Sequence, residues 1–282
     1  MKKSGCEECR LRIVLVGDVH MGPSNSTRPG EETPVLMQEL VEKINSEIKP
    51  DLVIELGDRI NNSNPLSDRD NAIRFASIIS RLSMPYHLIL GNHDIHHLTK
   101  KENEAIFGKP VLRRAESFKG FKLIFLDTEE PVIEGVGGSI SDEQLQWLNF
   151  ELNNDDLPKI VFGHHPIDEQ DIGDNPHFLE FPPLAFTKNR DKVREILDSG
   201  KNVISYINGH VHWFSFCTGK SVPAISVPSF TEAWPEKSNA PGMFAEVSFT
   251  QSKDIQVAIR SIRPNRILGK FSWTVTESVP VR

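Results

Sequence analysis

LRIVLVGDVH, residues 11–20, joins an apolar run to a glycine, a carboxylate and a histidine. An apolar run that ends in Gly-Asp is typical of a buried β-strand followed by a tight turn. Asp18 and His20 are two residues apart, so both side chains can point the same way as the chain leaves the strand. The segment therefore predicts a central strand that presents two metal-binding groups at its carboxyl end.

The same arrangement occurs four more times along the chain. An apolar run precedes each of Gly57-Asp58, Gly91-Asn92-His93-Asp94, Gly163-His164-His165-Pro166 and Gly209-His210-Val211-His212. One such pattern is usually structural, because Asp or His after a strand can cap the next helix. Helix capping does not account for five runs that contain six of the ten histidines. We therefore interpret the five runs as parts of one metal site.

Apolar periodicity predicts alternating strands and helices over the first two-thirds of the chain. Strands are expected at 11–16, 52–56, 87–90, 123–126, 160–162 and 203–207, and helices at 35–48, 69–82, 142–152 and 191–197. Ser141 and Gln144 form the pattern of a capping box before the third helix. Further strands are expected at 224–227, 244–249 and 255–259.

The alternation predicts parallel strands joined by crossover helices. The later strands predict a second sheet that stacks on the first, with helices outside. Ligands of open α/β sheets bind at the carboxyl ends of the strands, and all five runs fall there.

The length and composition favour one large domain. The chain has 282 residues, without a repeat or a Gly/Ser linker. We expect a flexible N-terminal tail over 1–10, a domain over 11–230, and a β-rich C-terminal extension over 231–282 packed on the same domain. The formal charge of −7 argues against a nucleic-acid surface, although bound cations can still attract a small anionic substrate.

The cysteine usage favours a reducing compartment. Cys6, Cys9 and Cys217 are odd in number and form no disulfide framework. Cys6 and Cys9 make a lone CxxC without further zinc ligands, so we interpret it as unrelated to the site. The apolar run at 11–16 is too short for a signal peptide, and no stretch has membrane-spanning length. We expect a cytoplasmic protein without a membrane partner, and its oligomeric state is open.

Seven side chains in the five runs are candidate metal ligands: Asp18, His20, Asp58, Asn92, His164, His210 and His212. They are enough for two ions that share one bridging carboxylate, and Asp58 has the two oxygens that a bridge needs. Nitrogen and oxygen donors without a thiolate suit Fe, Mn, Zn, Co or Ni better than copper(I) or an iron–sulfur cluster. Two ions about 3.5–4 Å apart can clamp the attacking and leaving oxygens of a phosphoryl displacement.

The ordered set of Asp-x-His, Gly-Asp, Gly-Asn-His-Asp, Gly-His-His-Pro and Gly-His-x-His resembles the calcineurin-like metallophosphoesterase superfamily. The resemblance covers residues 11–230, and the compact layout is similar to the cyclic-nucleotide phosphodiesterase (class III) branch. It implies a four-layer αββα sandwich with two stacked mixed sheets. It also implies two Mn, Fe or Zn ions with a bridging hydroxide as nucleophile. The implied ligands are Asp18, His20 and His212 for the first ion, Asn92, His164 and His210 for the second, and Asp58 as the bridge.

The resemblance further implies that His93 lies beside the scissile phosphate as general acid or charge stabiliser, with Asp94 orienting it. A histidine that is not itself a ligand suits proton transfer, because its ordinary pKa lies near neutrality. Asn92 and His93 are expected to bind substrate. Arg59 can meet phosphate or be a surface charge, and His165 can touch substrate or support a ligand.

Hydrolysis of a phosphodiester, either a cyclic nucleotide or another small diester, is the leading function. A phosphomonoesterase is one alternative. A pyrophosphatase for ADP-ribose or another nucleoside diphosphate conjugate is a second, because residues 226–241 with Glu232 resemble the manganese-dependent ADP-ribose family. A non-catalytic binding module is a third, against which the intact ligand set counts.

The expected partner is a small phosphorylated molecule such as a nucleotide. Its choice is expected to depend on an irregular insert at 168–187, which we interpret as a lid, a specificity loop or a packed loop.

Overall fold

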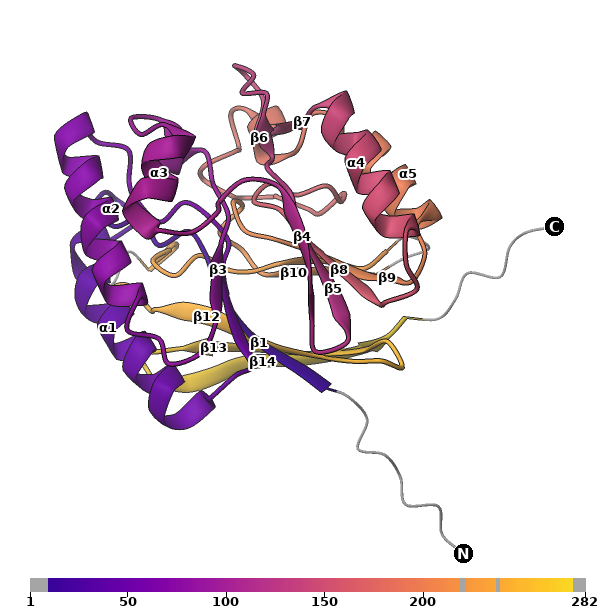
Figure 1. The fold of residues 1–282 in the computed structure, drawn as a ribbon. Helices are drawn as coiled ribbons and strands as arrows, with labels where there is room; N and C mark the ends of the chain where they lie inside the picture. The colour runs from indigo at the N-terminus through magenta and orange to yellow at the C-terminus, as the bar shows by residue number, and fades with distance from the viewer. Residues whose placement is uncertain (1–9, 219–221, 237–238, 276–282) are drawn as a thin grey trace, which may run out of the picture.

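The computed structural model describes residues 10–218, 222–236 and 239–275 of the chain. Within these residues, two six-stranded sheets stack face to face and helices cover their outer faces (Figure 1). The first sheet contains, in spatial order, β14 (Arg266–Thr274), β13 (Asp254–Ser261), β12 (Met243–Thr250), β1 (Arg10–Val16), β2 (Leu52–Glu55) and β3 (Tyr86–Leu88). The second contains β10 (Ser215–Cys217), β11 (Ala224–Ser226), β9 (Val203–Asn208), β8 (Lys159–Phe162), β5 (Phe121–Phe125) and β4 (Arg114–Phe118).

Helices lie on both sides of the stacked sheets. The helices are α1 (Thr33–Lys43), α2 (Pro65–Ile79), α3 (Lys100–Phe107), α4 (Asp142–Asn153) and α5 (Arg190–Ser199). The first three lie beside the first sheet, and α4 and α5 cover the second (Figure 1). A short pair, β6 (Glu129–Glu130) with β7 (Ser139–Ile140), stands apart from both sheets.

The predicted α/β class is confirmed, since both sheets are mixed and lie between helical layers. β1, β2 and β3 pair in parallel, as do β5, β8, β9 and β11. The predicted origin of the second sheet is correct only in part. The strand expected at 224–227 belongs to the second sheet as β11, but those expected at 244–249 and 255–259 are β12 and β13, which extend the first sheet together with β14. The other strands of the second sheet come from the middle of the chain. An apolar pattern identifies a strand but does not specify the sheet edge at which it pairs.

The two ends of the chain meet in the first sheet. Arg10 already belongs to β1, and residues 1–9, with both cysteines of the CxxC, lie outside the described residues. β12 pairs antiparallel with β1 from Arg10↔Thr250 to Leu15↔Ala245. A domain boundary at residue 230 stays a prediction, but backbone hydrogen bonds tie the segment after it to the first strand. Cys217, at the end of β10, is an exposed free thiol.

β1 is buried on both faces, which explains its continuous apolar sequence. Ile13 and Leu15 belong to the core between the two sheets. Val14 and Val16 belong to the core between the first sheet and its helices. Successive side chains of a strand point to opposite faces, so one strand contributes to two of the three apolar layers.

The predicted helices are present, and their ends differ by a few residues. α1 continues as a π-helical turn over Ile44–Ile48 and stops at Lys49, whose φ is 47°. α2 starts earlier than expected because Asn64 caps it, accepting a hydrogen bond from Ser67 N. Ser141 caps α4, but the Gln144 side chain bonds the backbone of residue 127, so the expected reciprocal box does not form. α3, β4, β10 and β14 were not predicted.

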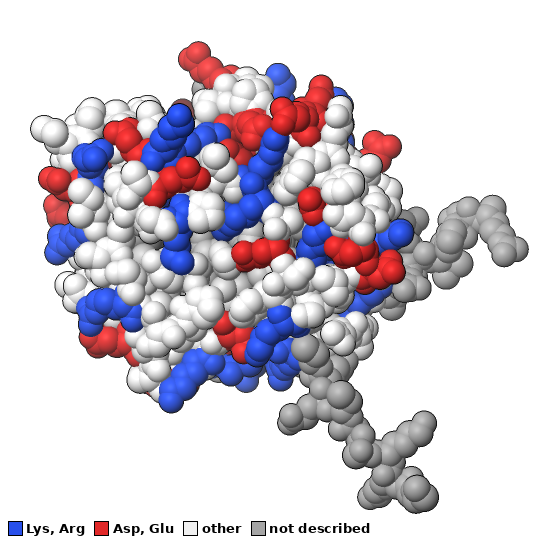
Figure 2. All heavy atoms as spheres, in the orientation of Figure 1, with Lys and Arg blue, Asp and Glu red and all other residues white. Residues whose placement is uncertain are grey.

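None of the helices in the described part of the chain is long and apolar enough to cross a membrane. Acidic and basic side chains are interspersed over the face shown in Figure 2. The net negative charge is therefore not gathered into one patch on that face.

The fold brings all five runs to one end of the stacked sheets. Three runs follow β1, β2 and β3 of the first sheet, and two follow β8 and β9 of the second. Their loops are joined by backbone hydrogen bonds, such as Asp18 N to Gly57 O at 2.9 Å and Gly209 N to His164 O at 3.1 Å.

Candidate metal centre

The loops that carry the candidate ligands have an unusual backbone. Five of the seven candidates have positive φ: Asp18 at 53°, His20 at 48°, Asp58 at 55°, His210 at 72° and His212 at 64°. This region is unfavourable for residues with a side chain and costs on the order of 1–3 kcal/mol each. Such a conformation persists where the surrounding structure holds the residue in place. Here it directs each of the five side chains toward a common centre.

The first ligand group joins the run after β1 to the run after β9. His20 Nε2 and His212 Nε2 lie 3.0 Å apart, and Asp18 Oδ1 lies 3.6 Å from His212 Nε2. All three side chains are buried. Their ligand atoms therefore converge as the sequence predicts for one ion.

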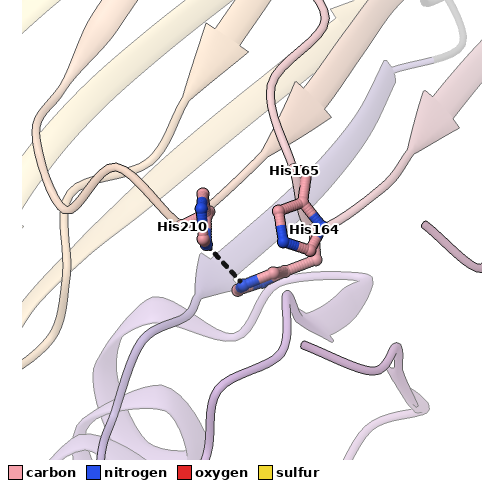
Figure 3. A group of neighbouring side chains, drawn as sticks. All are labelled: His164, His165 and His210. Atoms are coloured by element: carbon pink, nitrogen blue, oxygen red, sulfur yellow. Dashed lines mark hydrogen bonds between the residues drawn. The ribbon is translucent and has the colours of Figure 1, made fainter. Parts of the chain in front are cut away.

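The second ligand group joins the runs after β8 and β9. His164 Nε2 lies 3.2 Å from His210 Nδ1, and Figure 3 shows the two rings directed at each other. Asp58 Oδ2 is 3.4 Å from His164 Nε2 and 4.0 Å from His20 Nε2, so this oxygen lies between the two groups. The buried Asn92 Oδ1 has no hydrogen-bond partner among the described residues.

These features fit transition-metal binding. A buried oxygen without a partner, as at Asn92, costs about 1–3 kcal/mol unless something else binds it. Burial opposes a charge on His164, but Asp58, Asp18 and the hydrogen bond to the Leu56 carbonyl together raise the pKa of His164 to about 10. Burial lowers the pKa of His210 to about 3 and that of His212 to about 4. The centre thus favours positive charge while it keeps two imidazoles neutral, which is the state in which imidazole binds a metal.

Hydrogen bonds to backbone carbonyls fix the orientation of two ligand histidines. His164 Nδ1 donates to Leu56 O at 2.8 Å, and His210 Nε2 donates to Leu184 O at 2.8 Å. A carbonyl can only accept, so the proton of each ring sits on the nitrogen that faces the carbonyl. In neutral His210 the other nitrogen carries its lone pair toward the centre, and His164 Nε2 would do the same once a metal replaced the proton that it shares with Asp58 and His210.

Glu232 fixes the orientation of a third histidine, His212. Its Oε2 accepts hydrogen bonds from His212 Nδ1 at 2.8 Å and from His177 Nε2 at 2.7 Å. Burial would raise the pKa of Glu232, but these two hydrogen bonds hold it well below its usual range. In the sequence, Glu232 contributes only to the resemblance with the ADP-ribose family, and its contact with His212 was not predicted, because it lies twenty residues beyond His212 in a segment without periodicity.

The insert at 168–187 packs against the centre. It supplies the Leu184 carbonyl, the His177 imidazole and Phe178, whose ring centroid is 5.1 Å from that of His210. Of the three interpretations of this insert, the packed loop describes its contacts best, and the same residues also line the cavity above the ligands.

His93 lies at the cavity wall beside the two ligand groups. Its Nε2 is 3.9 Å from Asp58 Oδ2, and its backbone N donates to Asp58 Oδ1 at 2.8 Å. The Asp94 carboxylate has other partners than the expected His93 ring. It accepts from the backbone N of Gly91, Asp58 and Arg59 at 2.9–3.0 Å. No hydrogen bond joins Asp94 to the His93 ring among the described residues, so Asp94 holds the turn that carries Asp58.

Neither expectation for Arg59 holds. The side chain is fully buried and does not reach the cavity. Its Nη2 lies 2.7 Å from Glu55 Oε2, and its guanidinium stacks over Phe107. A carboxylate inside a buried strand needs such a partner, and Glu55 lies four residues earlier in β2. The available signal that Arg59 is structural was Glu55 itself, a carboxylate inside an apolar strand that needs a buried cation.

His165 is buried beneath His210 and does not line the cavity. Its Nδ1 is 2.8 Å from Thr128 Oγ1, and its ring centroid is 4.2 Å from that of His210 (Figure 3). Nitrogens of His164, His165 and His210 all lie within 4.8 Å of one another. Support of a neighbouring ligand describes this position better than contact with substrate.

A cavity of about 580 Å³ opens above the ligands, a size typical of small-molecule sites. The residues that line it include Asp58, Asn92, His93, His210 and His212. Residues 132–137 and three residues of the insert, His177, Phe178 and Leu184, also line it. Predicted metal and substrate residues therefore share one accessible space.

Comparison with known proteins agrees with this geometry. A family model described as calcineurin-like phosphoesterase matches residues 11–214. A probable cyclic nucleotide phosphodiesterase of Synechococcus is 31% identical over 46% of this chain and 51% of its own. A cAMP/cGMP dual specificity phosphodiesterase of Mycobacterium tuberculosis is 27% identical over 78% of this chain and 67% of its own.

A further relative and two solved structures extend the comparison. A probable glycerophosphodiester phosphodiesterase of Arcobacter nitrofigilis is 29% identical over 58% of this chain and 57% of its own. The chain thus spans about half the length of the first relatives that it matches. A dimetal phosphatase from Danio rerio has a TM-score of 0.74 at 17% identity, over 96% of this chain and all of its own. A purple acid phosphatase of yellow lupin has a TM-score of 0.68 at 16% identity, over 95% of this chain and 54% of its own. At these identities the two structures show a shared fold.

Glu232→Gln is expected to weaken metal binding about 10–100-fold. A neutral amide accepts more weakly than a carboxylate and no longer holds His212 Nδ1 as firmly. Competition against a chelator measures the effect. Glu236→Gln, at an exposed carboxylate in the same segment, is the matched control. Equal metal affinity in both variants would contradict the orienting role of Glu232.

Arg59→Met is expected to lower the free energy of unfolding by about 3–5 kcal/mol, because it leaves Glu55 buried without its partner. Denaturant titration followed by circular dichroism measures this loss. Arg69→Met removes an ion pair with Glu102 in which both side chains are about half exposed, and should change stability by less than about 1 kcal/mol. A small loss in Arg59→Met would show that the buried pair is dispensable.

Proposed function

We propose that this chain, which belongs to the calcineurin-like phosphoesterase family, is a dinuclear metal-dependent hydrolase of small phosphodiesters. The observation that carries the proposal is the position of Asp58 Oδ2 between the two histidine pairs, in the lining of an open cavity. The donor set suits two Mn, Fe or Zn ions. When bound, such ions neutralise phosphoryl charge and acidify a water molecule.

The protein fixes Asp58 through both its backbone and its side chain. Asp94 accepts from Asp58 N, and Asp58 Oδ1 accepts from His93 N. Only Oδ2 then faces His20 and His164. The Asp58 carboxylate, which would bridge the two ions, is therefore held in place before a substrate arrives, and this spares the reaction the cost of arranging it.

His93 is arranged to deliver a proton to the leaving group. Its Nδ1 accepts from Asn62 N at 3.5 Å, so the ring proton of neutral His93 sits on Nε2. That nitrogen is the one near Asp58 Oδ2, and the ring lines the cavity. As an imidazolium, His93 carries this proton on Nε2 and can give it to an alkoxide as the bond to phosphorus breaks, which leaves a neutral imidazole.

Relatives named as cyclic nucleotide and glycerophosphodiester phosphodiesterases support a diester as the substrate. The partner we propose is accordingly a small phosphorylated molecule such as a cyclic nucleotide. We place the reaction in the cytoplasm, on the basis of the cysteine usage.

The purified chain loaded with Mn²⁺ is expected to hydrolyse bis(p-nitrophenyl) phosphate faster than p-nitrophenyl phosphate, and to release AMP from cyclic AMP. Chelation should remove the activity, and added Mn²⁺ should restore it, because the ions supply the nucleophile and the charge stabilisation. Preference for the monoester would favour a phosphomonoesterase, and cleavage of ADP-ribose alone would favour a pyrophosphatase. A chain that binds no metal and hydrolyses none of these would favour a binding module.

His93→Ala is expected to keep a near-normal metal content and to lower kcat for cyclic AMP about 10²–10⁴-fold. The loss should be much smaller for bis(p-nitrophenyl) phosphate, since p-nitrophenolate leaves without a proton. Asp58→Asn should lower both metal content and kcat, because a neutral amide bridges two cations poorly. Elemental analysis and steady-state kinetics measure these effects. Loss of metal in His93→Ala, or equal losses on both substrates, would contradict the role as general acid.

A further inference from the structure

Arg28 is the only lysine or arginine among the described residues that line the cavity. It lies in the loop between β1 and α1, and its side chain is partly buried. Its Nη1 is 3.2 Å from His20 Nδ1 and 3.3 Å from His20 Nε2. Its Nε is buried without a hydrogen-bond partner, and within the described residues no carboxylate lies within 4 Å of the guanidinium. The guanidinium therefore has unused donors beside the metal centre.

The loop holds Arg28 in this position. Asn25 Oδ1 accepts from Thr27 N at 3.0 Å and from Arg28 N at 2.9 Å. Ala233 N donates to Thr27 O at 2.8 Å, which ties the loop to the segment that carries Glu232. These hydrogen bonds therefore hold the backbone from which the Arg28 side chain extends.

The contact between Arg28 and His20 leaves the donors of the guanidinium poorly used, because an Nη1 nearly equidistant from both ring nitrogens lies over the ring and on neither lone pair. A guanidinium has five N–H donors and no acceptor. When His20 binds an ion through Nε2, the neutral ring keeps its proton on Nδ1. Neither ring nitrogen can then accept from Arg28, and a donor would face a donor. With metal on His20, the donors of Arg28 would be available to another acceptor in the cavity.

Bound metal would also change the negative charges that surround Arg28. Burial lowers the pKa of Arg28, and Asp58, Glu232 and Asp18 oppose that shift. Asp58 and Asp18 are candidate metal ligands, and bound cations offset their charge. Of these three carboxylates only Glu232 then keeps its charge uncompensated, and it is already bonded to His212 and His177. A phosphoryl group at the centre carries further negative charge that a guanidinium can bind.

We propose that Arg28 is a substrate-binding residue that donates hydrogen bonds to the non-bridging oxygens of the phosphoryl group at the metal centre. This inference rests on the proposed function and adds to it the residue that recognises the phosphoryl anion. Inorganic phosphate carries the same oxygens, so it serves as a probe that needs no turnover.

The experiment compares wild type, Arg28→Met, Arg28→Lys and the surface control Arg69→Met, all as full chains loaded with Mn²⁺. Metal content is measured by elemental analysis and the Kd of inorganic phosphate by calorimetry. We expect equal metal content in all four and a Kd about 10–100-fold higher in Arg28→Met. Arg28→Lys should recover part of the affinity, because it keeps the charge without the planar fork. The Km for bis(p-nitrophenyl) phosphate should rise in parallel.

An unchanged phosphate Kd in Arg28→Met would overturn the inference. Loss of metal in that variant would also overturn it, by showing that Arg28 supports His20. The two proposals fail separately. A wild type that hydrolyses no phosphodiester, with phosphate binding that still depends on Arg28, contradicts the proposed function alone. A wild type that hydrolyses phosphodiesters, with phosphate binding indifferent to Arg28, contradicts this inference alone.

Discussion

The centre depends on the hydrogen bonds that the Asp94 carboxylate accepts. It accepts three backbone N–H groups from the loops after β2 and β3, and Arg59 Nη1 lies 3.5 Å away. Arg59 is in turn paired with Glu55 of β2. One buried network therefore joins the strand, the turn that carries Asp58 and the turn that carries His93. Because Asp58 has a positive φ, its turn needs such a network to stay in place.

The two sheets are joined at the centre by the ligand loops themselves. His210 N donates to both carboxylate oxygens of Asp18 at 3.0 Å, and His164 Nδ1 donates to Leu56 O. Phe230 N also donates to Gly17 O at 3.0 Å. Each of these bonds links a loop that follows a strand of the second sheet to a loop that follows a strand of the first. The stacking of the sheets and the geometry of the ligand groups are thus set together, so a change in one would be felt by the other.

The sequence predicted the parts of the site whose signal is local. A buried strand, a glycine and a nitrogen or oxygen donor occur within a few residues, and the edge of a sheet gathers such runs. Glu232, His177 and Arg28 could not be predicted, because each comes from an irregular loop and gains its role through a contact between distant segments. The Leu184 carbonyl has no sequence signal at all. The prediction for Arg59 was wrong because a charged side chain was expected to contact water or substrate, whereas it forms a buried ion pair with Glu55. Periodicity could not show that β12–β14 belong to the first sheet, because that depends on the pairing of β12 with β1.

The partners of the ligand histidines divide the centre into a supported side and an open side. His164, His210 and His212 each place their second nitrogen against an acceptor, which favours a lone pair on the nitrogen that faces the centre. In the described part of the chain, the second nitrogen of His20 meets only Arg28, which is a donor. Three candidate ligands therefore have their second nitrogen fixed by the protein alone, whereas the fourth, His20, has only a donor beside it. If the proposed metal binds there, Arg28 is the cation left beside the centre, with its donors directed at the cavity that a phosphoryl anion would enter.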